Sequence, residues 1–116
     1  MKYKTVELSG LALEFAAHKA MGTFDDEAIG LTGLTLADYV GAGGGFGLDW
    51  ETCGAAIDRE RISLLPEHRG GDWDACINAM HTYDGWEGKY DASGPTAIIA
   101  AMRCLVSAKL GSEVDL

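Results

Sequence analysis

The chain has 116 residues, the length of one ordinary domain, so we expect a single domain over residues 1–116. Hydrophobic residues make up 47% of it and charged residues 23%, a composition that excludes wholesale disorder. The net charge is −9, with 18 acidic side chains against 9 lysines and arginines. Non-specific binding to nucleic acid requires a basic surface, so we expect no nucleic-acid partner.

The sequence contains no apolar run of about 18 residues, the length that a membrane-spanning helix needs. The basic start from Met1 to Lys4 is followed by Glu7 and Glu14, which interrupt the apolar stretch of a signal peptide. These features predict a protein of the cytoplasm with no membrane partner.

Three cysteines, Cys53, Cys76 and Cys104, lie far apart in the sequence and include no CxxC pair. An odd number at this spacing argues against a disulfide framework and against a structural zinc site. We expect reduced, mostly buried thiols that behave as small hydrophobic groups. The histidines also lack the spacing of metal ligands, so we predict no metal and no cofactor.

The first half of the chain predicts one clear helix, over residues 6–20, because its apolar residues recur at helical spacing. Thr5 or Ser9 can cap this helix, and Gly22 can end it. Residues 23–49 are undecided, although Thr35 can cap a short helix there. The glycine-rich run 41–47 fits neither common phosphate-loop pattern, which leaves a mobile connection or a lid over a pocket as its interpretation.

The second half predicts three strands. Alternation indicates the first strand over residues 56–65, with Glu60 on the same face as the apolar side chains that follow it. A second strand is expected over residues 73–80. A hairpin turn at Asp84-Gly85 then leads into a third.

A helix over residues 97–110 is the best-marked element. Pro95 stands just before it, where a missing N–H costs nothing, and Gly111 is placed to end it. Residues 113–116 alternate and can add an edge strand. Together these elements predict an α+β fold, in which a small, mainly antiparallel sheet of three to four strands packs against an N-terminal and a C-terminal helix.

The sequence GPTAIIAAMRCLVSAKLGSEV, from Gly94 to Val114, resembles the ending GPTxxIAAMRxxVxxKxGxxV of the NinX-like proteins of P22-like and lambdoid phages and prophages. The segment ELSGLALEFA, from Glu7 to Ala16, is similar to the opening helix of the same family. Shorter matches at residues 49–50, 57–64 and 73–75 follow in the family's order. The likeness is lost over residues 23–48 and 76–92.

The resemblance implies a phage accessory protein that modulates host physiology or defence in the host cytoplasm, and not a component of the virion. It implies no particular biochemical activity. The residues themselves show no nucleophile elbow of the GxSxG type, so we expect a non-enzymatic protein. A small hydrolase acting on a nucleotide signal is kept as an alternative.

The residues that we expect to bind a ligand are aromatic or basic residues beside predicted turns, together with residues of the last helix. They are Trp50, Arg59, Arg61, Trp73, Thr96 and Arg103. Tryptophan rings can stack on a planar ligand, and the free N–H groups of a helix start can bind an anion. We therefore predict sequestration of a small anionic, nucleotide-like ligand, such as a host defence signal.

Two other interpretations of the same residues stay open. In the first, they are structural: the tryptophans close the sheet edges, Arg103 pairs with Glu60, and Pro95 only starts a helix. In the second, the acidic surface and exposed aromatic residues bind and occlude a host protein. The alanine-rich last helix could also pack against a second copy in a homo-oligomer.

Overall fold

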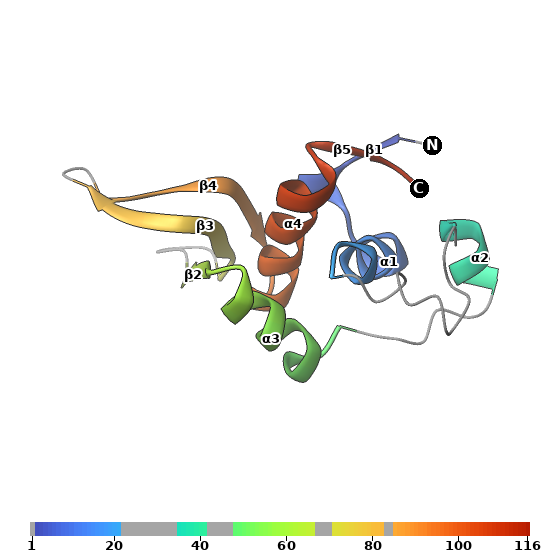
Figure 1. The fold of residues 1–116 in the computed structure, drawn as a ribbon, viewed down its shortest axis with the longest axis horizontal. Coiled ribbons are helices and arrows are strands. Elements are labelled where there is room, and N and C mark those ends of the chain that lie inside the picture. Colours follow the sequence, from blue (N-terminus) through green and yellow to red (C-terminus); the bar gives the residue numbers. More distant parts are fainter. Residues whose placement is uncertain (1, 22–34, 42–47, 67–70, 83–84) are drawn as a thin grey trace.

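A computed structural model describes residues 2–21, 35–41, 48–66, 71–82 and 85–116 (Figure 1). The elements in chain order are β1 (Lys2–Lys4), the 3-10 turn η1 (Thr5–Glu7), α1 (Gly10–Ala20), α2 (Leu36–Gly41), α3 (Trp50–Arg59), β2 (Ile62–Pro66), β3 (Trp73–Thr82), β4 (Gly85–Gly94), α4 (Ala97–Leu110) and β5 (Glu113–Asp115). Strands β2, β3 and β4 form one antiparallel sheet in that order, and β1 pairs with β5 in another. The predicted α+β class is confirmed.

Helix α4 lies at the centre of the fold, between the three-stranded sheet and α1 (Figure 1). A helix that is apolar on every side must be buried on every side. Half of its 14 residues are buried: Ala97, Ala100, Ala101, Met102, Cys104, Leu105 and Val106. Its start is fixed by Thr96, whose hydroxyl accepts a hydrogen bond from the Ile99 backbone N–H at 3.1 Å.

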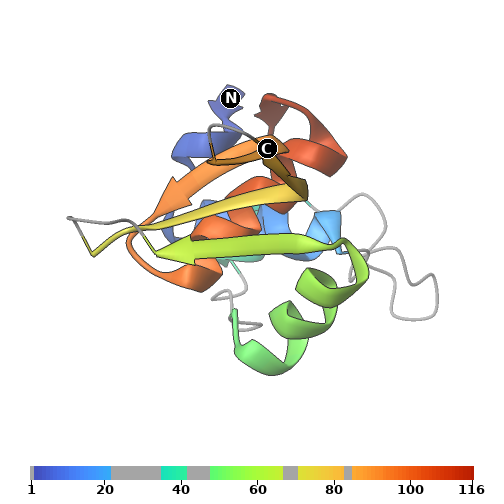
Figure 2. The ribbon, with the colours of Figure 1, turned by 90° about the vertical axis from the view of Figure 1, so that its left-hand side faces the viewer.

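The three-stranded sheet has one covered face. Ile62, Ala75, Ile77 and Ala92 are buried in the core that α4 completes. The opposite face is turned to the viewer in Figure 2, and none of the described helices lies in front of it. We call this side of the β2-β3-β4 sheet the open face.

The strand predicted over residues 56–65 is wrong in its first half, because those residues belong to α3. The Asp49 carboxylate accepts a hydrogen bond from the Thr52 N–H at 2.8 Å and so caps this helix. Cys53 and Ala56, three residues apart, are both buried, which is the helical spacing of core positions. The backbone then adopts a φ of 56° at Arg61 and leads into β2.

Glu60 therefore does not lie on a strand beside the core, as the alternation had suggested. It is the C-cap residue of α3, directly after the last helical residue, Arg59. Its carboxylate lies 3.1 Å from the Lys109 ammonium group and 3.4 Å from Nε of Arg59. These two cations, Lys109 first, lower the pKa of the Glu60 carboxyl.

The short helix expected after Thr35 is confirmed as α2. The Asp38 N–H donates to the Thr35 hydroxyl at 3.2 Å, and the Thr35 N–H donates back to the Asp38 carboxylate at 3.1 Å. This reciprocal pair resembles a capping box. Tyr39 holds α2 on α1, because its ring packs against Phe15 and its hydroxyl donates to the Glu14 carboxylate.

The first helix begins at Gly10, four residues later than predicted. The N–H and the hydroxyl of Thr5 both donate to the Ser112 carbonyl, at 3.0 and 3.1 Å, and residues 5–7 form the separate turn η1.

The expected edge strand near the C-terminus exists as β5, but it pairs with β1 and not with the main sheet. The predictions for Gly22, for the turn at residue 84 and for residues 42–47 lie outside the described residues.

Strands β3 and β4 contain two compensating irregularities. Ala75 is paired with Ala92 and Ile77 with Lys89, so β4 carries one extra residue there, next to Tyr90 with a φ of 59°. Beyond this point β3 carries the extra residue, next to Asn78 with a φ of 55°. Bulges of this kind twist a strand pair and redirect its side chains. Here the second irregularity restores the strand register that the first irregularity shifts.

Gly94 lies directly against α4 at the end of β4. A Cβ atom at Gly94 would lie 2.7 Å from Cγ2 of Ile99 and 3.0 Å from the Ala100 nitrogen. We expect Gly94→Ala to lower the free energy of unfolding by about 1–3 kcal/mol, because the packed helix must move. Urea denaturation followed by circular dichroism measures this change.

Gly54→Ala is the matched control, since a Cβ atom at Gly54 in α3 would meet nothing within 4 Å. We expect it to be neutral or to raise stability by up to about 1 kcal/mol, the usual gain for alanine in a helix. Equal losses in the two variants would contradict the close contact at Gly94.

Candidate functional site

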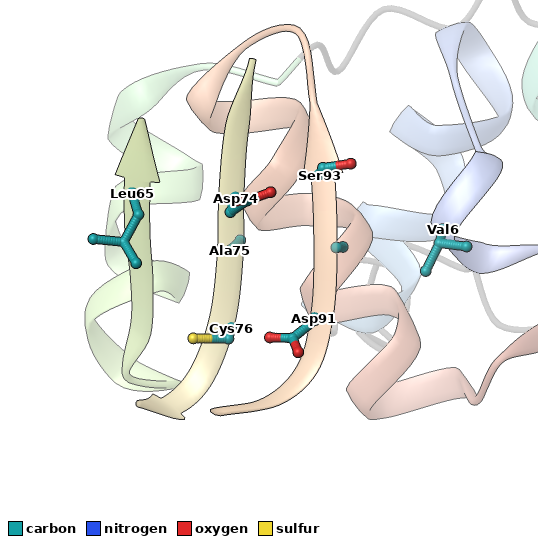
Figure 3. Close-up of a pocket in the computed structure, with 8 residues that line it drawn as sticks. Val6, Leu65, Asp74, Ala75, Cys76, Asp91 and Ser93 are labelled. Carbon is teal, nitrogen blue, oxygen red and sulfur yellow. The ribbon is translucent and has the colours of Figure 1, made fainter. Parts of the chain in front are cut away.

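The open face carries alternate residues of each strand, and the register of the sheet sets them side by side. Leu65 of β2 is opposite Asp74 of β3, and Asp74 is opposite Ser93 of β4. Asp91 lies two residues before Ser93 and therefore on the same face, one row along the sheet (Figure 3).

A pocket of about 550 Å³ lies on this face. Residues of β2, β3, β4 and the turn η1 surround it: Val6, Leu65, Asp74, Ala75, Cys76, Asp91, Ala92 and Ser93 (Figure 3). We call it the open-face pocket. Its charged lining residues, Asp74 and Asp91, are both acidic. A fixed pair of carboxylates attracts cations and repels phosphate groups.

Cys76 is one of the buried residues of the pocket lining, together with Ala75 and Ala92, and is only 7% exposed. Glycine at position 88 leaves room for the thiol, because a Cβ atom there would lie 2.5 Å from its sulfur. Burial raises the pKa of the Cys76 thiol, and the charges of Asp91 and Asp74 raise it further. A thiol with a raised pKa is protonated at neutral pH and is a poor nucleophile.

The expectation of reduced, buried cysteines is confirmed for all three, which are free and buried. Desolvation raises the pKa of the Cys53 thiol to about 11 and that of Cys104 to about 12. These two side chains have the character of core residues, with no exposure to solvent.

Three of the residues predicted to bind a ligand lie on or next to α3. Trp50 is the first residue of this helix and is 59% exposed, whereas Arg59 is the last. At 1.5 Å per residue, the two are separated by roughly 13 Å along the helix axis. Arg61 follows the helix and lines a second, shallow hollow of about 350 Å³, which Gly54, Ile57, Asp58, Ile62 and Ser63 complete.

Trp73 and Thr96 lie at the other end of the main sheet. Strand β2 starts at Ile62, just after Arg61, and ends at Pro66, which pairs with Trp73. Trp73 also pairs with Gly94, two residues before Thr96. The predicted site is therefore divided between the two ends of β2, with Arg59 and Arg61 before its start and Trp73 and Thr96 near its end.

Arg103 holds two parts of the backbone together. Its Nε donates to the Leu8 carbonyl at 2.7 Å, and its Nη1 donates to the Ser93 carbonyl at 2.8 Å. The pairing with Glu60 that the structural interpretation assumed is wrong, because Glu60 bonds Lys109 and Arg59 instead. Arg103 thus links α4 to the start of α1 and to the end of β4.

The sequence-based reasoning did not select Asp74 and Asp91. A signal for Asp74 was present, because Asp74 alternates with Trp73 and Ala75 and so faces away from the core. For Asp91 the alternation is broken by the irregularity at Tyr90. Only the strand register shows that the two carboxylates share a face.

Two kinds of site are absent from the part of the chain that the structure describes. No group of three or more His, Cys, Asp or Glu side chains there is arranged to hold a metal ion. Within the same residues, no helix has the length and apolar character required to cross a membrane.

The chain was compared with models of known protein families. The family described as "Bacteriophage P22, NinX" matches residues 4–109, which is nearly the whole chain. No curated protein matches the chain significantly.

The role of Arg103 can be tested with Arg103→Met, which keeps most of the apolar side chain but removes both hydrogen bonds. The carbonyl of the buried Leu8 would lose its donor, and an unsatisfied buried acceptor costs about 1–3 kcal/mol. We expect the free energy of unfolding to fall by that amount. Arg59→Met is the control and should cost less than about 0.5 kcal/mol, because the Arg59 side chain is 57% exposed. Equal effects would show that Arg103 has no special linking role.

Proposed function

The chain belongs to the NinX family of bacteriophage P22, and from this membership we propose a non-enzymatic phage accessory protein that binds and occludes a host protein through its open face. One observation carries the proposal. The face of the sheet opposite α4 holds a pocket of about 550 Å³ with apolar and acidic walls. Soluble domains ordinarily cover or charge such a surface, and a pocket in it is a typical contact site for a partner.

The chemistry of the pocket supports binding in preference to catalysis. Nucleophilic catalysis requires a side chain that a neighbouring base activates. The Cys76 thiol has a raised pKa, and the described residues that line the pocket around Ser93 include neither histidine nor lysine. The same lining argues against a phosphate-containing ligand at this place, because both of its charged groups are negative.

The distribution of apolar side chains supports a protein partner. Val6 and Leu65 are 44% and 38% exposed and lie on opposite sides of the two carboxylates (Figure 3). Protein interfaces combine apolar contact areas with a polar surround in this way. A small polar ligand would gain little from either side chain.

Site-specific photocrosslinking tests this proposal. We expect benzoylphenylalanine at Leu65 to give one discrete crosslinked product in host cells under ultraviolet light, because Leu65 would lie inside the interface. The same amino acid at Val40 on α2, which is also exposed, should give none. Mass spectrometry would identify the crosslinked protein. Products from Val40 alone, or from neither position, would contradict use of the open face.

A second candidate function is sequestration of a small anionic, nucleotide-like ligand, such as a host defence signal. The supporting observation is the hollow beside Arg61, with Arg59 two residues earlier. Asp58 in the same hollow and the bond of Arg59 to Glu60 both weaken its attraction for anions. We therefore place this candidate second.

Thermal unfolding separates the two candidates. Saturating AMP or cyclic di-AMP should raise the melting temperature by several degrees if the hollow binds nucleotides, and Arg61→Gln should abolish that rise. Under the first proposal, neither compound changes the melting temperature.

A further inference from the structure

We propose that the partner presents an extended basic segment, and that one of its lysine or arginine side chains enters the open-face pocket between Asp74 and Asp91. The inference rests on the proposed function, because it names the chemistry of the partner at the same face. Three features support it: the placement of the two carboxylates, the charge around them and the apolar side chains on either side.

The two carboxylates are spaced to hold one cation. Asp74 is opposite Ser93 in the register, and Asp91 is two residues from Ser93 on the same strand. Such diagonal neighbours have Cβ atoms about 7–8 Å apart. In Figure 3, Asp74 lies level with Ser93 and Asp91 level with Cys76, on the same face of the sheet. An ammonium or guanidinium group between them can donate hydrogen bonds to both carboxylates at the usual distance of about 2.8 Å.

Among the described residues that line the pocket, none is a lysine, arginine or histidine that could neutralise the negative charge of Asp74 and Asp91. Burial raises the pKa of the Cys76 thiol, and the nearby charges of Asp91 and Asp74 raise it further, as expected for a group beside two carboxylates. The chain as a whole carries a net charge of −9, which draws a basic partner from a distance.

The apolar side chains favour a polypeptide over a free small cation. The proposed cation lies between Asp74 on β3 and Asp91 on β4. Leu65, on β2, is about one and a half strand spacings, or roughly 7 Å, from that position. A segment extended across the strands advances by nearly the same distance in two residues. If its basic side chain enters the pocket, the residue two positions away contacts Leu65, and the residue two positions away on the other side points toward Val6. The expected motif is apolar-x-basic-x-apolar.

Fluorescence anisotropy with a labelled peptide, Gly-Ser-Val-Ser-Arg-Ser-Val-Ser-Gly, tests this motif on the full chain. We expect saturable binding, and at least tenfold weaker binding of the same peptide with glutamine in place of arginine. The double variant Asp74→Asn/Asp91→Asn should also lose tenfold or more in affinity. Its matched control, Glu51→Gln/Glu113→Gln, removes the same charge from exposed positions elsewhere and should stay within twofold. Circular dichroism would establish that each variant is folded.

Several results would overturn the inference. They are equal binding of the glutamine peptide, equal loss in the Glu51→Gln/Glu113→Gln control, absence of binding by the folded wild type, and displacement of the peptide by an equimolar amount of spermine. Failure here is distinguishable from failure of the proposed function. A photocrosslink at Leu65 that the Asp74→Asn/Asp91→Asn change leaves intact would keep the open face as the interface and reject only the basic segment.

Discussion

The burial of α4 is the constraint on which the rest of the structure depends. This helix has no polar side wide enough to face water, so other elements must surround it. The sheet covers one side, and α1, η1 and α3 contact the others. Arg103, the charged residue near its middle, is half-buried and is used to join the Leu8 and Ser93 carbonyls. The sheet, α1, η1 and α3 are thus positioned by their contacts with α4, whereas α2 packs on α1 and β1 pairs with β5.

One consequence of this arrangement is a sheet with an uncovered side. The chain uses its apolar helix on one face of β2-β3-β4, and none of the described helices covers the other (Figure 2). Antiparallel sheets tolerate a solvated face when polar side chains occupy it, and Asp74, Asp91 and Ser93 do so here. The same polar side chains line the open-face pocket. The residues that make a solvated face tolerable are therefore also the ones that carry the proposed binding surface.

Much of the fold could be predicted from sequence, and the site could not. Helix α4 has strong local signals in Thr96, Gly111 and its apolar residues, which is why its bounds were predicted correctly. The alternation of polar and apolar residues predicts a strand over residues 56–61. The Asp49 cap instead starts helix α3, which includes residues 56–59. The placement of Asp74 and Asp91 on one face of the sheet depends on strand register and on a bulge, which no local pattern encodes.

Carboxylate footprinting by mass spectrometry most directly tests the central claim that the open face is the working surface. A carbodiimide and glycine ethyl ester would label exposed carboxylates on the purified protein and on the protein in a host-cell extract. The account predicts that Asp74 and Asp91 lose labelling in the extract, while Glu51 and Glu113 keep theirs. Unchanged labelling of Asp74 and Asp91, with protection elsewhere on the chain, would contradict it.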